Sequence, residues 1–339
     1  MPFTVTNQRN DASFECLSGE SILDAALRAN RIYPYGCRNG ACGACKCDLI
    51  SGSVDYGTYE EYTLTKEDIK DNKILLCQAK PLGDVVFSAE EIRAGSGARI
   101  KTLPCRVQDI RRAAEDVAIV RLQIPNTQDF DFVPGQYIDI LLKDGQRRSF
   151  SIASLPEDVE HDGIEIHVRH VADGLFTPRV FNELKPRDLL RFEGPFGTYL
   201  LQSEPDQTIL MIAGGTGFAP IKALISQCQK TNLEQNIHLF WGARDEQDLY
   251  LNELAEQWCA TLPRFQYTPV ISGGQTEKWG GETGFVHHAV LRHYEDVSQF
   301  DVYASGPPIM VDAVRDNLGP RGLKNERFFF DSFEYSAAR

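Results

Sequence analysis

The sequence predicts a chain of three domains in series: an α+β unit, an antiparallel β-barrel and a parallel α/β domain. Three observations support this reading. The 339 residues exceed the size of one ordinary domain. The composition shifts near residue 93 to the Gly- and Ser-containing run RAGSGARI, and the hydrophobic pattern changes again near residue 204. We therefore expect domains at 1–92, 101–203 and 204–339, with a linker at 93–100.

The first domain combines short strands with one helix. Residues 3–6 and 13–16 alternate around a polar turn and predict two strands. Residues 21–29 place Ile22, Leu23, Ala26 and Leu27 on one helical face. Residues 35–45 are rich in Gly, Ala and Cys and have no period, so we expect a loop, after which a strand resumes.

The second domain is predicted from short alternating runs separated by turn signals. The runs are 118–124, 137–142 and 164–170. The turns between them contain Pro-Gly and Asp-Gly pairs, for example Pro134-Gly135 and Asp162-Gly163. Short strands at such spacing indicate an antiparallel barrel.

The third domain alternates apolar strand candidates with helical spacing. The predicted strands are 209–213, 237–241, 266–271 and 301–304, and the predicted helices are 221–228 and 249–259. This alternation is typical of a parallel α/β sheet.

Composition excludes several function classes. The formal charge of −13 makes nucleic-acid binding a poor candidate, because that binding needs Lys and Arg against phosphate. No apolar run approaches the ~18 residues of a membrane span. The first residues, MPFTVTNQRND, lack the pattern of a signal peptide, so we expect a cytoplasmic protein.

Four of the nine cysteines have the spacing of metal ligands. Cys37, Cys42 and Cys45 form C-x4-C-x2-C, and Cys77 follows after a longer gap. This is the plant-type ligand spacing of a [2Fe–2S] cluster. A structural zinc site is the alternative, although such sites usually show two C-x2-C pairs and this chain shows one. Cys47 alternates with Cys45 and is expected to be a small apolar residue.

The stretch YGCRNGACGACKCDLISG resembles the plant-type ferredoxin domain, with all four ligand positions filled. The resemblance covers the first ~90 residues. It implies a β-grasp fold whose cluster carries one electron at a potential of roughly −400 mV.

Three short motifs in the second domain resemble the flavin-binding barrel of the ferredoxin–NADP reductase superfamily: RSFS at 148–151, GLFT at 174–177 and GPFG at 194–197. The resemblance implies that Arg148 pairs with a flavin phosphate, Phe150 packs on the flavin and Ser151 lies near flavin N5. The flavin-binding residues implied are Arg148, Ser149, Phe150, Ser151, Gly174 and Thr177. The N-terminal position of the ferredoxin domain resembles the FAD branch of the superfamily rather than the FMN branch.

A glycine-rich loop follows a buried strand in the third domain and opens a helix, the context of a phosphate-binding loop. Its sequence, AGGTGFAP, is not a G-x-G-x-x-G, so a Rossmann dehydrogenase is a poor fit. It resembles the nicotinamide-binding domain of the same superfamily. The binding residues implied are Gly214, Gly215, Thr216, Gly217 and Pro220.

A second nicotinamide motif, YASGPPIM at 303–310, resembles the superfamily's Cys-Gly-Pro. Ser305 stands where the cysteine is usual, followed by Gly306 and Pro307. The resemblance also implies an aromatic ring beside the flavin, for which Phe333 is the candidate; a core role in the last strand is the alternative. After the second strand, Asp245 favours NADH and Arg244 leaves NADPH possible.

Together the motifs resemble reductases that pass electrons from NAD(P)H through FAD and a [2Fe–2S] cluster to a partner protein. Two subfamilies share this domain order. One, the CDP-6-deoxy-Δ3,4-glucoseen reductases, serves a pyridoxamine-phosphate dehydratase, and the runs KDGQRRSFSIAS and RFEGPFGTYL look closer to it. The other comprises reductase components of bacterial diiron or Rieske oxygenases. A free flavin reductase and a redox sensor are alternatives of different classes.

Overall fold

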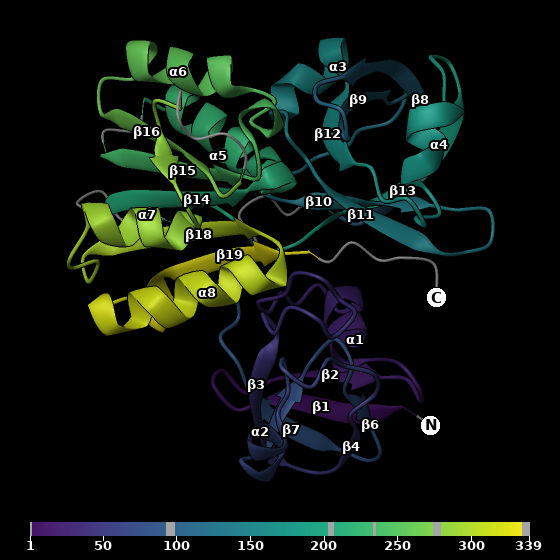
Figure 1. The fold of residues 1–339 in the computed structure, drawn as a ribbon. Helices are drawn as coiled ribbons and strands as arrows, with labels where there is room; N and C mark the ends of the chain where they lie inside the picture. Colours follow the sequence, from purple (N-terminus) through teal and green to yellow (C-terminus); the bar gives the residue numbers. More distant parts are fainter. Residues whose placement is uncertain (1, 93–98, 203–206, 233–234, 274–278, 334–339) are drawn as a thin grey trace. The chain divides into compact units, whose positions relative to one another are not determined.

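A computed structural model describes residues 2–92, 99–202, 207–232, 235–273 and 279–333 (Figure 1). The chain divides into two compact units, Met1–Gly97 and Ala98–Arg339. Most of the expected linker (93–98) and the expected second boundary (203–206) lie outside the described residues. The boundaries of the three expected domains therefore stay a prediction.

The first unit is a five-stranded sheet of order β2-β1-β7-β3-β5 with one main helix. Ser21 caps that helix by accepting a hydrogen bond from the backbone of Asp24. β1 and β7 run parallel, and the other neighbours are antiparallel. The elements are β1 Phe3–Asn7, β2 Ala12–Cys16, α1 Ile22–Arg28, β3 Lys46–Ser51, β4 Val54–Asp55, α2 Lys66–Lys70, β5 Lys73–Leu75, β6 Lys80–Pro81 and β7 Val85–Ser88. This is the β-grasp arrangement that the ferredoxin resemblance implied.

The first half of the second unit is an antiparallel sheet of order β11-β10-β13-β8-β9-β12. A bridge between Ile152 and Ile166 joins its two ends, so the sheet closes into a barrel. Its core is apolar and includes Val107, Ile138 and Phe192. The elements are β8 Lys101–Arg112, β9 Val117–Gln123, β10 Tyr137–Leu141, β11 Arg147–Ser151, α3 Val159–Asp162, β12 Ile164–Arg169, α4 Thr177–Asn182 and β13 Leu189–Phe196.

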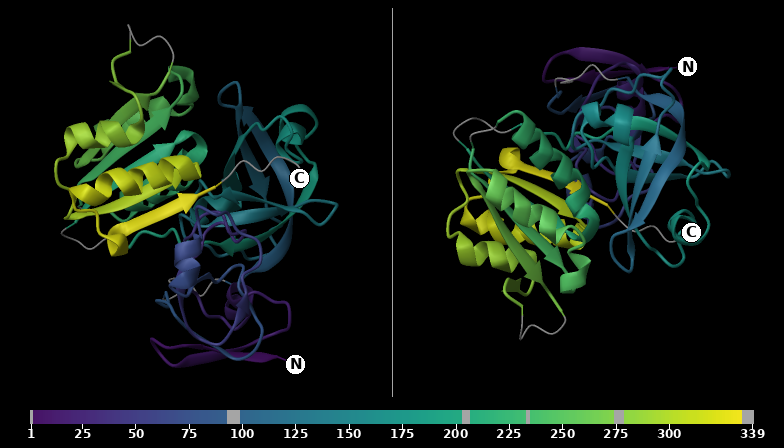
Figure 2. Two further views of the ribbon diagram at one scale, coloured as in Figure 1. Left: turned by 60° about the horizontal axis from the view of Figure 1, so that its bottom comes forward. Right: turned by 90° about the horizontal axis from the view of Figure 1, so that it is seen from above.

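The second half is a parallel sheet of order β17-β16-β15-β14-β18-β19. α5 and α6 cover one face, and α7 and α8 cover the other (Figures 1 and 2). The elements are β14 Thr208–Gly214, α5 Phe218–Lys230, β15 Ile237–Ala243, α6 Asn252–Thr261, β16 Phe265–Ile271, β17 Glu282–Thr283, α7 Val286–His293, β18 Phe300–Gly306, α8 Pro308–Leu318 and β19 Phe328–Ser332. Of the helices described, none combines the length and the apolar character that a bilayer crossing requires.

The barrel also contributes residues to one of the apolar clusters of the parallel sheet. Val117 and Ile119 of β9 pack in the same cluster as Trp241 of β15 and Ile221 of α5. This continuous packing accounts for their behaviour as one compact unit.

The structure corrects one helix start. The apolar spacing predicted a helix from Leu249, but α6 begins at Asn252. Leu249 and Tyr250 are buried in the turn before the helix. Their apolar spacing therefore continues that of the helix, although their backbone is not helical.

Candidate functional site

The four cysteines of the first unit come from two segments. Cys37, Cys42 and Cys45 lie on the loop before β3, and Cys77 follows β5. The backbone N–H of Cys37 donates to Sγ of Cys42 at 3.4 Å, and the N–H of Cys42 donates to Sγ of Cys37 at 3.3 Å. Contact with Cys42 lowers the pKa of the Cys37 thiol to about 6. The interaction with Cys77 and burial raise the pKa of Cys45.

These contacts group the thiols into two pairs, Cys37 with Cys42 and Cys45 with Cys77. Among the described residues, no three His, Cys, Asp or Glu side chains gather around a single metal position. Two thiol pairs suit a cluster of two iron atoms, whereas a zinc ion requires ligands gathered around one point. The donor set therefore fits the [2Fe–2S] cluster better than zinc.

Cys47 is separate from this set. It lies in β3 opposite Ile74, and burial raises the pKa of its thiol to about 12. Such a thiol stays protonated, as expected for a small apolar residue.

The loop that carries three of the cysteines is tightly fitted. Gly40 has φ +84°, and a Cβ there would lie 2.6 Å from the carbonyl oxygen of Thr58. The hydroxyl of Thr63 donates to the carbonyl of Ala41 at 3.0 Å. A larger residue at position 40 would displace the loop.

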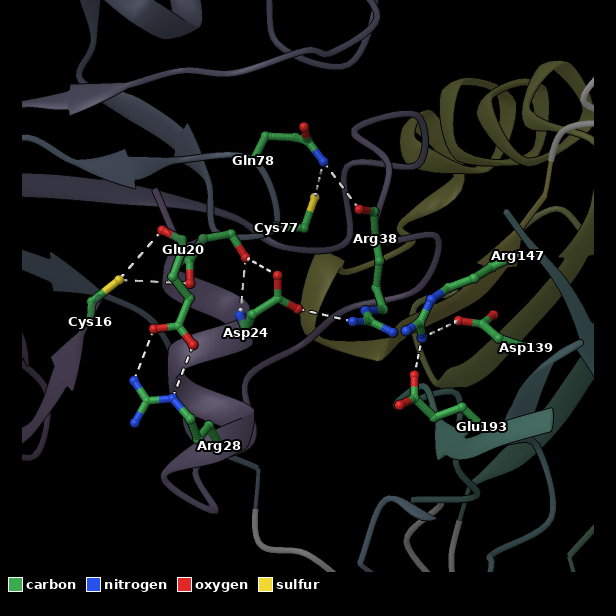
Figure 3. Close-up of polar contacts among 11 residues, drawn as sticks. Cys16, Glu20, Asp24, Arg28, Arg38, Cys77, Gln78, Asp139, Arg147 and Glu193 are labelled. Atoms are coloured by element: carbon green, nitrogen blue, oxygen red, sulfur yellow. Dashed lines mark hydrogen bonds and ion pairs between the residues drawn. The ribbon is translucent and has the colours of Figure 1, made fainter. Parts of the chain in front are cut away.

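Two further contacts hold the loop in place (Figure 3). The amide of Gln78 donates to the carbonyl of Arg38 at 3.1 Å and approaches the sulfur of Cys77 at 3.9 Å. The guanidinium of Arg38 pairs with Asp24 of α1 at 2.9 Å. Gln78 thus links the segment of the fourth cysteine to the loop of the other three.

In the barrel, the motif at 148–151 forms the last four of the five residues of β11, which pairs with β10. Arg147 forms ion pairs with Glu193 and Asp139 (Figure 3). Arg148 instead donates to the carbonyl of Arg147 and to the side chain of Gln146, and within the described chain its guanidinium has no carboxylate partner. Arg148 is therefore the arginine of this strand that is available to a phosphate.

The other predicted flavin-binding residues have their own contacts. Ser149 donates to Asp139 at 2.6 Å, and the ring of Phe150 lies 5.5 Å from that of Phe176. The hydroxyl of Thr177 bonds both the N–H and the carbonyl of Val171, at 2.9 and 3.1 Å. The N–H of Gly174 also donates to Val171, at 2.9 Å. In this structure the hydrogen bonds of Gly174 and Thr177 thus stabilise the turn that begins at Val171.

Ser151, at the end of β11, contacts a residue that the sequence analysis missed. Its hydroxyl donates to the carboxylate of Asp331 in β19 at 2.9 Å. Burial raises the pKa of Asp331 to about 6, while the bond from Ser151 acts in the opposite direction. The run FFFDSFEY places the acidic residue Asp331 among aromatic residues, and this is the sequence signal that points to a buried carboxyl.

The glycine-rich loop lies at the carboxyl end of β14, where the strand order reverses between β15 and β18. Such a switch point is where open α/β sheets bind ligands. A Cβ on Gly217 would lie 2.0 Å from the carbonyl oxygen of Ser305, so only glycine fits. Thr216 is buried in this loop, and Pro220 is buried in the first turn of α5. Gly214 and Gly217 thus lie against Gly306 and Ser305 at the end of β18, where this strand order predicts a ligand crevice.

Ser305 is fully buried, and its hydroxyl has no hydrogen-bond partner among the described residues. An unpaired buried hydroxyl at this crevice fits a bound polar ring that would complete it. Pro307 precedes α8. The N–H of Phe333 donates to the carbonyl of Gly306 at 3.3 Å, so the expected aromatic lies just beyond β19 and beside this crevice.

Two more residues at the loop were missed. The indole N–H of Trp241 donates to the carbonyl of Gly215 at 3.0 Å. Gly215 has φ +53°, and a Cβ there would lie 2.8 Å from the guanidinium of Arg169. The guanidinium of Arg169 therefore lies against the loop, where it also forms an ion pair with Asp116 at 2.9 Å.

A cleft of about 960 Å³ lies near the end of β15. Asp245 lines it together with Arg111, Tyr250 and Asn252. The backbone N–H of Asp245 donates to the carboxylate of Asp248 at 3.2 Å, and the N–H of Asp248 donates to the carbonyl of Asp245 at 3.0 Å.

Comparisons with known proteins agree with this geometry. Three family profiles match in order: a 2Fe-2S iron-sulfur cluster binding domain at residues 5–82, an oxidoreductase FAD-binding domain at 104–200 and an oxidoreductase NAD-binding domain at 211–316. Fold and site together define an NAD(P)H-dependent electron-transfer oxidoreductase with flavin and iron–sulfur groups. The chain belongs to the family of iron–sulfur flavoprotein reductases that join a ferredoxin domain to a ferredoxin–NAD(P) reductase-type module.

Similar proteins span nearly the whole chain. It is 41% identical over 313 residues to the CDP-6-deoxy-L-threo-D-glycero-4-hexulose-3-dehydrase reductase of Yersinia pseudotuberculosis, covering 92% of this chain and 93% of that protein. It is 34% identical over 327 residues to the terephthalate 1,2-dioxygenase reductase component 1 of Comamonas sp, covering 96% of each. Among solved structures, the Amycolatopsis cytochrome P450 reductase GcoB matches with a TM-score of 0.82 at 27% identity, covering 98% of each chain.

Proposed function

We propose that this chain uses NADH to supply electrons to a CDP-hexulose dehydrase in deoxysugar synthesis. When bound, the nicotinamide, flavin and cluster together convert a two-electron hydride donation into single-electron delivery. The single observation that carries the assignment is the 41% identity to the dehydrase reductase of Yersinia, against 34% to the terephthalate dioxygenase reductase component. The second candidate is service to an oxygenase component.

We assign the residues to three binding sites, one each for the cluster, the flavin and the nicotinamide. We assign the cluster to the thiolates of Cys37, Cys42, Cys45 and Cys77. We assign flavin binding to Arg148, Ser149, Phe150, Ser151, Gly174 and Thr177, with Arg148 on a phosphate. We assign nicotinamide binding to Gly214, Gly215, Thr216, Gly217, Pro220, Ser305, Gly306 and Pro307.

Ser151, Ser305 and Phe333 are the residues we place at the reacting rings. Ser151 donates to Asp331, and this bond orients its hydroxyl at the end of β11. Ser305 offers a hydroxyl that has no partner among the described residues, and the backbone N–H of Phe333 donates to the carbonyl of Gly306. Because its pKa is raised only to about 6, Asp331 is mostly ionised at neutral pH and accepts the hydrogen bond from Ser151.

We favour NADH because Asp245 lines the cleft near the end of β15, where a carboxylate suits a ribose hydroxyl and repels a 2′-phosphate. We also propose a cytoplasmic location, because all nine cysteines are free thiols and four of them must stay reduced to hold the cluster.

The route through the cluster is tested by replacing one ligand and one neighbour. We expect Cys42→Ser to abolish the cluster absorbance and sharply lower cytochrome c reduction, while NADH-dependent ferricyanide reduction survives. Cys47→Ser is the matched control and should keep both activities. Survival of both activities in Cys42→Ser would favour a free flavin reductase. If the wild-type protein reduced neither cytochrome c nor ferricyanide, a redox sensor would be favoured.

The partner is tested by reconstitution. An anaerobic pull-down with NADH present, from the native host, should recover a pyridoxamine-phosphate-dependent dehydratase. Adding that purified protein should accelerate NADH consumption in the presence of its sugar nucleotide. Recovery of a diiron or Rieske oxygenase component instead would overturn the dehydrase assignment.

A further inference from the structure

One strand of the barrel carries a polar row that faces the nicotinamide-binding half of the same unit. In β12, Ile164, Ile166 and Val168 face the apolar barrel core. Glu165 and His167 alternate with them and are buried as well. Since successive residues of a strand point to opposite faces, these two polar side chains lie on the outer face.

The row makes buried polar contacts with α5 and with the turn before α6. The carboxylate of Glu165 lies 3.0 Å from Nζ of Lys222 in α5 and 3.0 Å from Nε2 of His167. Nδ1 of His167 lies 2.8 Å from the hydroxyl of Tyr250. Burial opposes the charge of Glu165, yet the bond from His167 and the charge of Lys222 hold its pKa well below the usual range.

Lys222 has a second contact that joins two parts of the proposed site. Its ammonium donates to the carbonyl of Ala153 at 2.8 Å. Ala153 is two residues beyond Ser151, and Lys222 is in the second turn of the helix that the glycine-rich loop opens. One side chain therefore connects the strand end beside the flavin to the helix beside the nicotinamide.

We propose that Lys222, held by Glu165 and His167, is a positioning residue that sets the separation between the nicotinamide loop and the flavin-side strand. This inference rests on the proposed placement of nicotinamide at Gly214–Gly217 and of flavin beside Ser151. Hydride transfer depends steeply on the separation of the reacting rings, and a displacement of ~1 Å costs on the order of a hundredfold in rate. A half-buried, charge-paired lysine limits that displacement.

The chain supplies a matched control on the same helix. Lys230, at the other end of α5, pairs with Glu157 of the barrel, but its side chain is 57% exposed. Exposed ion pairs contribute little, so loss of this pair should leave positioning intact. Comparing the Lys222 and Lys230 variants shows whether positioning depends on the Lys222 contacts in particular or on any ion pair between the two halves.

The test uses Lys222→Met alone and, if that variant folds poorly, the double variant Glu165→Gln/Lys222→Met. The double variant leaves no buried carboxylate without its lysine, and Arg121, which also pairs with Glu165, is 41% exposed and keeps Asp162. Tryptophan fluorescence during thermal unfolding checks the fold. Anaerobic stopped-flow then measures the limiting rate of flavin reduction and the half-saturating NADH concentration. Long-wavelength charge-transfer absorbance, recorded after NAD⁺ is added to the reduced enzyme, reports ring stacking independently of turnover.

We expect the folded double variant to reduce its flavin about ten- to a hundredfold more slowly at unchanged half-saturating NADH, with weaker charge-transfer absorbance. Lys230→Met should stay within about twofold of wild type. A double variant with wild-type rate and absorbance, or one that changes only NADH affinity, would overturn the inference. Absence of flavin reduction by either nicotinamide in the wild type would instead overturn the proposed function.

Discussion

Asp331→Asn should make the second unit more stable at alkaline pH. Burial raises the pKa of Asp331 from 3.8 to about 6, so folding favours its protonated form. The stabilisation from that proton is fully present below about pH 4 and is lost as pH rises through about 6. Above that range the buried carboxylate opposes folding, and asparagine removes this cost while still accepting the bond from Ser151.

The magnitude follows from the shift of about two pKa units. At ~1.4 kcal/mol per unit, the ionised carboxylate lowers the free energy of unfolding by about 3 kcal/mol at pH 8. At pH 5, where the folded-state group is mostly protonated, the cost is roughly half of that. The stability advantage of Asp331→Asn should therefore grow by about 1.5 kcal/mol between pH 5 and pH 8.

The assay is urea unfolding of the flavin-loaded protein at both pH values, followed by tryptophan fluorescence. All three tryptophans lie in the second unit, at positions 241, 258 and 279, so the signal reports this unit alone. Asp316→Asn, on the exposed side of α8, is the control for loss of one surface carboxylate. A variant advantage that shrinks toward pH 8 would refute the assignment of a raised pKa to Asp331.

Three further predictions concern the ligand crevices. Gly217→Ala places a Cβ 2.0 Å from the carbonyl oxygen of Ser305, so we expect the free energy of unfolding to fall by about 2–3 kcal/mol and NADH oxidation to be lost. Gly319→Ala, where a Cβ would meet open space, is the control. Ser305→Ala removes a buried hydroxyl that has no partner in the part of the chain that the structure describes. Thermal unfolding should therefore show equal or about 1 kcal/mol higher stability, while flavin reduction slows. Arg148→Leu should raise the FAD dissociation constant about 10- to 100-fold, measured by fluorescence titration, with iron content unchanged as the internal check. Wild-type FAD affinity in that variant would remove Arg148 from the phosphate site.

Sequence alone determined the features whose parts are close together in the chain. Three of the four cysteines fall within nine residues, and the phosphate loop is one contiguous segment between a strand and a helix. The alternating and helical periods likewise determined which residues enter the cores of the barrel and the parallel sheet. Such local patterns depend on backbone geometry, which neighbouring residues specify.

Tertiary structure decided which distant residues meet. Ser151 and Asp331 are 180 positions apart and touch only because β19 joins the parallel sheet beside β18. Glu165 and Lys222 meet because the outer face of β12 packs against α5. The period of a strand predicts which face a residue occupies, but strand order and crossovers decide what that face contacts. In the first unit, the pairing of β3 with β5 brings Cys77 beside Cys45.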